Sequence, residues 1–352
     1  MKLVAATDKG LIIYAPTDGK WTLTDLAFVG LPVGAFHADE EGNWWVAINH
    51  KHWGSKLYLS GNEGKSFEEV AVPRHELNQN ETVRSIWTIQ STYINSALKL
   101  YIGTEPAALF VSDNYGQSFQ EITELSQHPS RPEWQGGGKG SKNPFLHSIV
   151  FHPHKPEELL VGISCAGVFK CSDEGHTWHP ANKGLKAFYL PDNSAPIGHD
   201  PHAILRHPQN PEVLWQQNHC GVFRSIDNGD NWQDVSDPNG MANYGFALAI
   251  DETDINKAWV IPAQSDDLRY PHDCKLAVYH TQDAGKSWQS TSNGLPQHTS
   301  FDLVLRAAFA KKGNYMAFGT NNGNLYLSVN QGNDWLTINQ NLSTIRSVSL
   351  VG

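Results

Sequence analysis

Short stretches of alternating apolar and polar residues recur along the chain, and many of them end at turns rich in Asn, Asp and Gly. Stretches directly before these turns are rich in β-branched and aromatic residues, as at 167–169, 221–223, 277–279 and 324–326. An alternation with a period of two is typical of a half-buried strand. The pattern therefore predicts an all-β chain.

Further apolar runs lie upstream of each turn. Residues 148–153 and 158–163 are one example, and a polar turn containing proline separates them. With the strand before the Asn/Asp-Gly turn and the one after it, each unit has four predicted strands.

An eight-residue motif recurs at these turns. It begins with Ser, Thr or Cys, has Asp or Asn at its third position and Gly at its fifth, and ends in Phe or Trp; its copies are 60–67, 112–119, 171–178, 225–232, 281–288 and 328–335. A degenerate seventh copy occupies 17–21. The acidic or amide side chain is expected to fold back onto backbone N–H groups, while glycine supplies a positive φ. The motif thus predicts a tight turn between two strands.

The motifs recur at roughly 50-residue intervals, a spacing typical of four-stranded propeller blades. The expected fold is an all-β, seven-bladed β-propeller of four-stranded blades, forming a single domain over 1–352. Residues 345–350 have the pattern of the first strand of a blade, but the other three strands of that blade do not follow them. The N-terminal segment supplies only the last three strands of a blade. Together they should make one blade and close the ring.

The motif resembles the BNR or Asp-box repeat of sialidases, sortilin-like receptors and many bacterial propellers named glycosyl hydrolases. The segments 103–110, 134–138 and 217–223 also resemble a group of uncharacterised bacterial Asp-box propellers. The resemblance covers essentially the whole chain and implies the propeller fold. It says little about activity, because Asp-box turns in those families lie far from the active face.

Charge and composition argue against two classes of partner, nucleic acids and membranes. The formal net charge of −10 comes without a basic stripe, so nucleic acid is not expected as a partner. No run of eighteen apolar residues is present, and the first residues do not form a signal-peptide core. We therefore expect a cytoplasmic protein without membrane contact, whose four cysteines are reduced.

Blade-to-blade equivalence predicts two polar rings around the channel mouth. The starts of the innermost strands carry Gly34, Arg84, His147, His202, Phe246, Arg306 and Arg346. The ends of the second strands carry Glu105, Ser164, Asn218 and Asn321, next to Cys165 and His219. Four long excursions, at 131–143, 186–200, 265–274 and 295–302, are expected to be binding loops near these rings.

Arginines gathered in one channel repel each other unless an anion binds there. The sequence therefore predicts a site for a small ligand that bears a carboxylate, sulfate or phosphate group, and an acidic carbohydrate is one such ligand. Its predicted binding residues are Arg84, Arg306, Arg346, Asn218, Trp134 and Arg269. The alternative is that each arginine pairs with a local acid such as Glu81, Glu105 or Asp302.

Histidines on neighbouring blades offer a divalent transition-metal site, with His147, His202 and His219 as predicted ligands. No compact motif such as HExxH is present. If the protein is a metal-assisted hydrolase or lyase, the predicted catalytic residues are Glu105 as general base and His147 and His202 as ligands or acid and base.

Two other functions stay open at this stage. A non-catalytic propeller could present its loops to a protein partner, which an exposed aromatic patch at Trp53 or Trp134 would favour. The resemblance also suggests an exo-sialidase. Sialidases bind the substrate carboxylate with three arginines, and Arg84, Arg306 and Arg346 could imitate this triad. However, the Phe/Tyr-Arg-Ile-Pro signature of true sialidases is absent from the N-terminal region.

Overall fold

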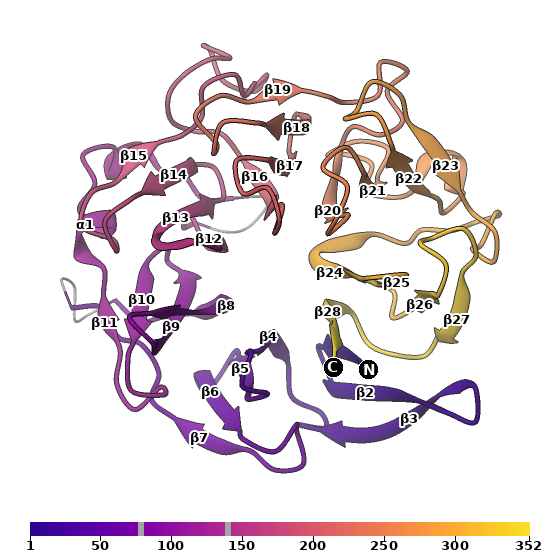
Figure 1. Cartoon of the computed structure of the whole chain (residues 1–352), viewed down its shortest axis with the longest axis horizontal. Coiled ribbons are helices and arrows are strands. Elements are labelled where there is room, and N and C mark those ends of the chain that lie inside the picture. Colours follow the sequence, from indigo (N-terminus) through magenta and orange to yellow (C-terminus); the bar gives the residue numbers. More distant parts are fainter. Residues whose placement is uncertain (77–80, 138–141) are drawn as a thin grey trace. The chain divides into compact units, whose positions relative to one another are not determined.

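The chain folds almost entirely into β-sheets (Figure 1). The computed structural model describes residues 1–76, 81–137 and 142–352. Helical structure in these ranges consists of one turn, α1 (Thr123–Ser126), and two 3-10 turns, η1 (Arg131–Glu133) and η2 (His272–Cys274). The predicted all-β class is confirmed. None of the helices in the described part of the chain is long and apolar enough to span a membrane.

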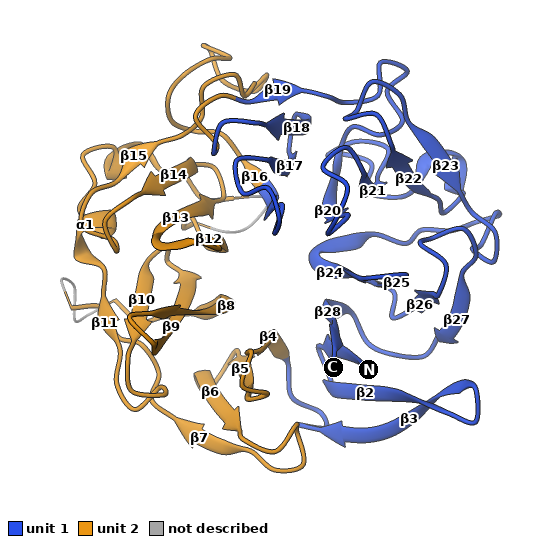
Figure 2. Cartoon of the chain, in the orientation of Figure 1, with its two compact units in different colours: residues 1–32, 202–228, 232–352 blue, residues 33–201, 229–231 orange. Residues whose placement is uncertain are grey.

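The chain divides into two compact units (Figure 2). Unit 1 comprises residues 1–32, 202–228 and 232–352, and unit 2 comprises 33–201 and 229–231.

The described residues of unit 2 form three four-stranded sheets, each in sequence order. The first contains β4 (Val33–Ala38), β5 (Trp44–His50), β6 (Gly54–Ser60) and β7 (Glu68–Val70). The second contains β8 (Ser85–Ile94), β9 (Ala97–Glu105), β10 (Leu109–Ser112) and β11 (Gln120–Glu121). The third contains β12 (Leu146–His152), β13 (Lys155–Ile163), β14 (Gly167–Cys171) and β15 (His179–Pro180).

Unit 1 contains two four-stranded sheets and one eight-stranded sheet. The four-stranded sheets consist of β16 (Pro201–Arg206), β17 (Leu214–Asn218), β18 (Gly221–Ser225) and β19 (Gln233–Asp234), and of β20 (Gly245–Ile250), β21 (Ala258–Pro262), β22 (Val278–Thr281) and β23 (Gln289–Thr291). The eight-stranded sheet has the order β27 (Leu336–Asn339), β26 (Leu325–Ser328), β25 (Tyr315–Thr320), β24 (Val304–Lys312), β28 (Ile345–Val351), β1 (Lys2–Thr7), β2 (Gly10–Thr17) and β3 (Lys20–Ala27).

The two ends of the chain meet in this eight-stranded sheet (Figure 1). β28 pairs antiparallel with β1, with Leu3 opposite Leu350. A single parallel bridge between Ala307 and Ser347 joins β28 to β24. The predicted union of the C-terminal strand with the three N-terminal strands is confirmed.

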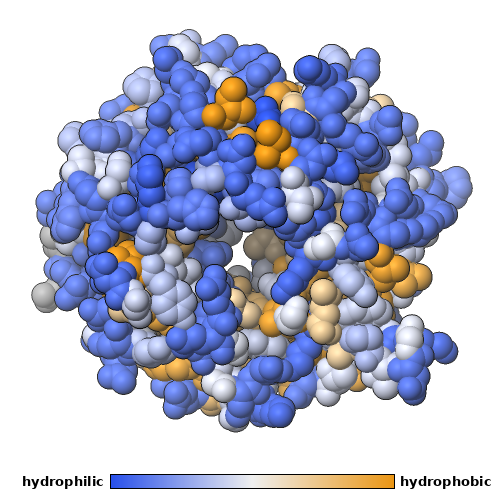
Figure 3. Space-filling model, in the orientation of Figure 1, coloured by the Kyte–Doolittle hydropathy of each residue, from blue (hydrophilic) through white to orange (hydrophobic). Residues whose placement is uncertain are grey.

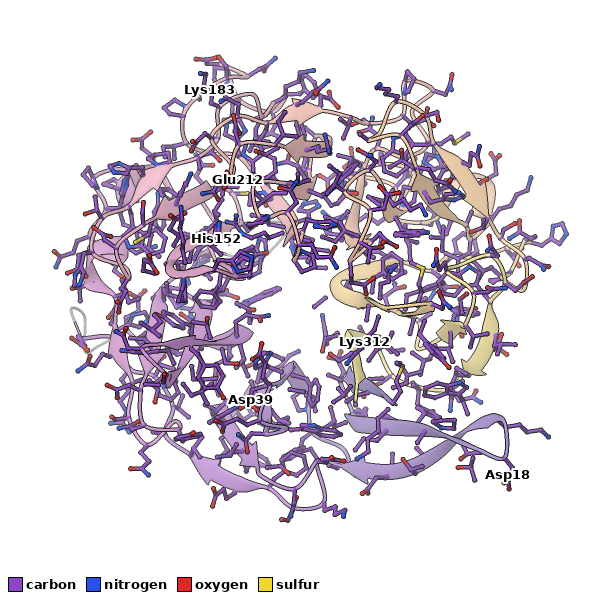
Figure 4. The ribbon with its side chains drawn as sticks, in the orientation of Figure 1. Asp18, Asp39, His152, Lys183, Glu212 and Lys312 are labelled. Atoms are coloured by element: carbon purple, nitrogen blue, oxygen red, sulfur yellow. The ribbon has the colours of Figure 1, made fainter. Side chains whose placement is uncertain are left out.

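The motif turns have the predicted hydrogen bonds. In the turn before β23, Asp283 Oδ1 accepts from Ser287 N at 2.9 Å, and Thr281 Oγ1 accepts from Gly285 N at 2.9 Å. Gly285 has φ of 85°. The same bonds recur around Asn62, Asp173 and Asn330. The degenerate copy is the tip of the β2–β3 hairpin, where Asp18 is labelled in Figure 4.

Asp283 provides a test of this turn. Hydrogen bonds from Ser287 lower its pKa to about 2. Because the folded-state pKa is depressed, the carboxylate stabilises the fold above its unfolded value of about 3.9, and this is lost as pH falls toward 2. We expect Asp283→Ala to cost about 1 kcal/mol of unfolding free energy at pH 7. Asp283→Asn should cost less, because Asn fills this place at Asn62 and Asn330. Denaturant unfolding measures both, and an equal loss in the two variants would contradict this role.

Large apolar side chains fill each unit. Trp44 and Trp45 in unit 2 and Trp215 in unit 1 are fully buried. Trp335 packs with Phe318 in the largest cluster of unit 1. On the face shown in Figure 3, hydrophilic residues dominate and hydrophobic residues form small separate groups.

A β-bulge interrupts the start of several innermost strands. In four sheets the first strand has one extra residue where it pairs with the second strand. The extra residue lies between Val33 and Ala35 in β4, Ile86 and Thr88 in β8, Leu146 and Ser148 in β12, and Gly245 and Ala247 in β20. A similar shift lies where β28 pairs with β1. The extra residues are Gly34, Trp87, His147, Phe246 and Arg346. Since a bulge redirects a side chain, these positions are suited to building a site.

Candidate functional site

The predicted strand register is largely confirmed. Gly34, His147, His202, Phe246 and Arg346 are each the second residue of an innermost strand. Arg306 is the third residue of β24. Arg84 is the exception, because Trp87 occupies the bulged position of β8 and Arg84 lies before the strand. The prediction that Arg84 occupies a position equivalent to these residues is therefore wrong, and Trp87, three residues later, occupies it.

Unit 1 brings several of these residues together around the ring of Phe246. His202 stacks on this ring with centroids 4.3 Å apart and planes at 16°. The guanidinium carbons of Arg269 and Arg306 lie 5.4 Å and 5.1 Å from the ring centroid. Both distances are within the range of a cation–π interaction. The aromatic ring thus holds two arginines, from the 263–275 loop and from β24, beside one histidine.

One carboxylate, Asp266, joins the same cluster. It accepts a hydrogen bond from Tyr244 Oη at 3.1 Å and pairs with Arg269. Its Oδ2 lies 3.8 Å from Nε2 of His219. Burial is the largest single effect and raises the pKa of Asp266, but the hydrogen bond and charge of Arg269, with smaller contributions from His219 and Tyr244, together outweigh it, and the net shift is downward. Asp266 is therefore ionised at neutral pH and offsets one arginine.

Tyr244 stays protonated in this setting. Burial is the largest cause that raises its pKa, and the Asp266 carboxylate adds to it, against the opposing effect of Arg269 and Arg306. A phenol has one proton, and Tyr244 donates it to Asp266. The cluster therefore combines two guanidinium groups with aromatic walls, and the bond from Tyr244 helps to hold Asp266 in place.

Two histidines of the cluster lie close together. His202 is 1% exposed, and its Nδ1 lies 2.6 Å from the carbonyl oxygen of Gly245. This bond assigns the proton to Nδ1 and makes Nε2 the nitrogen suited to a ligand. A ring nitrogen of His202 lies within 4.8 Å of one of His219. The pair is compatible with two ligands of one metal ion.

Buried amides support the segment that carries Tyr244 and Phe246. Gln217 donates from Nε2 to the carbonyl of Asn243 at 2.7 Å. Asn218 is fully buried, donates to Gln216 Oε1 at 2.7 Å and accepts from Cys220 N at 3.0 Å. Asn218 was expected to bind substrate, but its amide is used within the strand ends. We therefore assign it a structural role.

Arg346 is placed differently from Arg306. Its side chain is exposed, and its guanidinium bonds both carboxylate oxygens of Asp8, at 2.7 Å and 2.9 Å. This bidentate pair neutralises Arg346. The alternative that an arginine pairs with a local acid is thus realised here, although with Asp8, which the sequence reasoning did not name.

Unit 2 has its own group of predicted residues. Trp87 stacks on Phe145 with centroids 3.9 Å apart and donates from Nε1 to Glu105 Oε2 at 3.2 Å. His147 Nδ1 lies 2.9 Å from Ser148 Oγ, and its ring is 5.8 Å from Phe145. Glu105 and His147 thus lie near one aromatic pair. The joint site of His147 with His202 and His219 stays a prediction.

Trp134 does not line a site. It is 7% exposed, belongs to a core cluster of unit 2, and donates to Ser130 Oγ at 3.0 Å. Arg131 lies over its ring at 4.7 Å. Trp134 is therefore a core residue instead of the predicted ligand contact. Part of this excursion, 138–141, lies outside the described residues.

The sequence reasoning missed several residues of these clusters. Asp266, Tyr244 and Trp87 were not among the predicted site residues. Asp266 lies three residues before Arg269, and Tyr244 two residues before Phe246. A search for acidic and aromatic residues close in sequence to the predicted site positions could have found both.

Known structures resemble this chain in fold. An ancestral GH74 enzyme shares 19% identity with a TM-score of 0.59, over 87% of this chain and 37% of that one. A protein of Bacteroides uniformis, named as a candidate 6-phosphogluconolactonase, shares 11% identity with a TM-score of 0.60 over 99% of both chains. YCF48 bound to a D1 peptide shares 13% identity with a TM-score of 0.57, over 92% of this chain and 88% of that one.

The chain spans 37% and 65% of the length of two GH74 enzymes, the second from Niastella koreensis. No family model matches the chain, and no curated protein matches it significantly. At these identities the likeness establishes a β-propeller fold and nothing about activity.

Proposed function

We propose that residues 1–352 form a single seven-bladed Asp-box propeller that binds a small anionic ligand at the Phe246 cluster of unit 1. The blade number is supported by the sheets: three in unit 2, two in unit 1, and the eight-stranded sheet, which divides at the β24–β28 bridge into two sets of four. The recurring turn motif adds independent support.

The observation that carries the anion site is the placement of Arg269 and Arg306 over one aromatic ring. Two guanidinium groups in a partly buried cluster repel each other, and Asp266 balances one of them. A carboxylate, sulfate or phosphate beside the Phe246 ring would offset the repulsion between the two guanidinium groups and accept hydrogen bonds from them. Tyr244 and His219 add polar groups to the same walls.

Calorimetric titration with sodium phosphate, sodium sulfate and sodium glucuronate tests this function. At least one anion should bind, and Arg306→Ala should weaken its affinity roughly tenfold or more, as expected for a charge-assisted hydrogen bond. Arg346→Ala is the matched control, because Arg346 already pairs with Asp8. Absence of binding by all three anions, or equal losses in the two variants, would contradict the anion site.

A metal ion at His202 and His219 is a second candidate function, favoured by the approach of their ring nitrogens. A bound divalent metal would polarise an anionic substrate or acidify a water, as in metal-assisted hydrolases. We expect stoichiometric zinc, or another transition metal, in protein purified without a His tag. His219→Ala should remove it, while the matched variant His298→Ala should retain it. Elemental analysis that finds no metal in the parent protein would eliminate this candidate.

The non-catalytic alternative is a propeller that docks a protein. Phe188 and Tyr189 in the 186–200 excursion are 63% and 45% exposed, which favours a contact surface there. The YCF48 structure contains a bound D1 peptide. This alternative gains if no anion and no metal binds.

A further inference from the structure

The hairpin between β5 and β6 in unit 2 presents an aromatic ring to solvent. Trp53 lies at its tip and is 66% exposed. Its ring stacks on His50, with centroids 3.9 Å apart and planes at 14°. A large aromatic side chain so exposed, with one face covered by an imidazole, leaves its other face available to a ligand.

This ring is held in place by the hairpin itself. Nδ1 of His50 accepts hydrogen bonds from the backbone N–H groups of His52 at 3.2 Å and Trp53 at 3.3 Å. The imidazole is therefore fixed beneath the indole, and the turn is fixed around it. A preorganised aromatic platform lowers the entropy lost when a ligand stacks on it.

Arg84 approaches the same hairpin from the segment before β8. Ser55, two residues after Trp53, donates from Oγ to the carbonyl oxygen of Arg84 at 3.2 Å. Asn49 binds both the N–H and the carbonyl of Ile86, each at 2.9 Å. These bonds tie the base of the hairpin to the backbone at Arg84.

The Arg84 side chain differs from the other arginines of the predicted anion site. It is exposed, and within residues 1–76, 81–137 and 142–352 no ion pair or hydrogen bond engages its guanidinium. Arg346 pairs with Asp8 and Arg269 with Asp266. Arg84 is thus a cation available to an external anion, and exposed Lys51 in the same hairpin adds positive charge.

We propose that Trp53 and Arg84 form a binding site for an acidic sugar, in which a pyranose ring stacks on the indole and its carboxylate pairs with the guanidinium. The axial C–H groups of a pyranose carry partial positive charge and suit the negative face of an aromatic ring. Polar neighbours, His52, Lys51 and Arg84, match the hydroxyl-rich edge of a sugar. A protein partner would instead favour a wider apolar patch.

The site is independent of the Phe246 cluster, and the test separates the two. Trigalacturonate, maltotriose and AMP are titrated into the Arg269→Ala/Arg306→Ala variant, in which the cluster has lost its guanidinium groups. Binding is read from the NMR signal of the Trp53 indole N–H, assigned with Trp53→Phe. Trigalacturonate should shift this signal and bind at least tenfold more tightly than maltotriose.

Calorimetric titration in that background should show no binding of trigalacturonate by Trp53→Ala, which lacks the indole signal, and Arg84→Gln should reduce the affinity for trigalacturonate to that for maltotriose. Leu336→Ala, at another exposed apolar side chain, is the control and should have no effect. Absence of binding, equal affinity for the neutral and acidic sugars, or binding of AMP alone would overturn the proposal. Because the Phe246 arginines are absent throughout, failure here leaves the anion site of unit 1 untouched.

Discussion

Deleting residues 345–352 should abolish the cooperative melting transition of the protein, and the shortened chain should not be stably folded at physiological temperature. β28 is the strand that lies between β24 and β1, and its Ile345 and Val348 are buried in the largest cluster of unit 1. Without it, the edges of β1 and β24 expose unpaired backbone groups and a large apolar surface. We expect a chain that aggregates or melts far below the full-length protein.

The control for this deletion removes only residues 351 and 352, which keeps the buried part of β28. It should melt close to the full-length protein, as measured by circular dichroism and size-exclusion chromatography. A peptide of residues 345–352 added in trans should partly restore the transition, because it offers the same pairing partners. Cooperative melting of the longer deletion near the parent temperature would contradict the role of β28 in closure.

Lys311→Met should cost about 3 kcal/mol of unfolding free energy, because it leaves a buried carboxylate without its cation. Nζ of Lys311 lies 3.2 Å from Asp251 Oδ2 and also bonds Glu252. The side chains of Lys311 and Asp251 are 3% and 7% exposed. Trp259 packs beside the ammonium group, with its ring centroid 5.4 Å from Nζ.

The pH dependence and a double variant check the cause of that loss. Burial raises the pKa of Asp251, but hydrogen bonds from Thr253, Asp254 and Lys311 together hold it well below its ordinary value. The carboxylate thus stabilises the fold above its unfolded pKa of about 3.9, and this is lost as pH falls through the lower folded value. The deficit of Lys311→Met should shrink in acid, and Asp251→Asn should recover much of it at pH 7. An additive double variant would argue against a coupled pair.

The strands and turns could be predicted from the sequence because their causes are local. Asp283, Gly285 and the Ser/Thr hydroxyls bond within a few residues, so the motif carries its own geometry. Alternation before each turn depends only on which face is buried. The closing strand could be predicted because the N-terminal segment lacked a first strand.

The site could be predicted only in part, because side-chain direction depends on longer-range packing. β8 begins only at Ser85 and has its bulged position at Trp87, three residues after Arg84, and no residue type in the segment signals this offset. Trp134 follows a proline and precedes glycines, a pattern typical of an exposed loop, yet its indole enters the core. Arg269 reaches Phe246 only through the path of a long loop, which a sequence pattern does not encode.

The position of the anion is the most direct test of the proposed function. A crystal of the protein soaked in sodium selenate and measured at the selenium absorption edge locates a sulfate-like anion by its anomalous signal. The account predicts a peak within hydrogen-bond distance of the guanidinium groups of Arg269 and Arg306. A map with selenate elsewhere, and none at these two arginines, would contradict it.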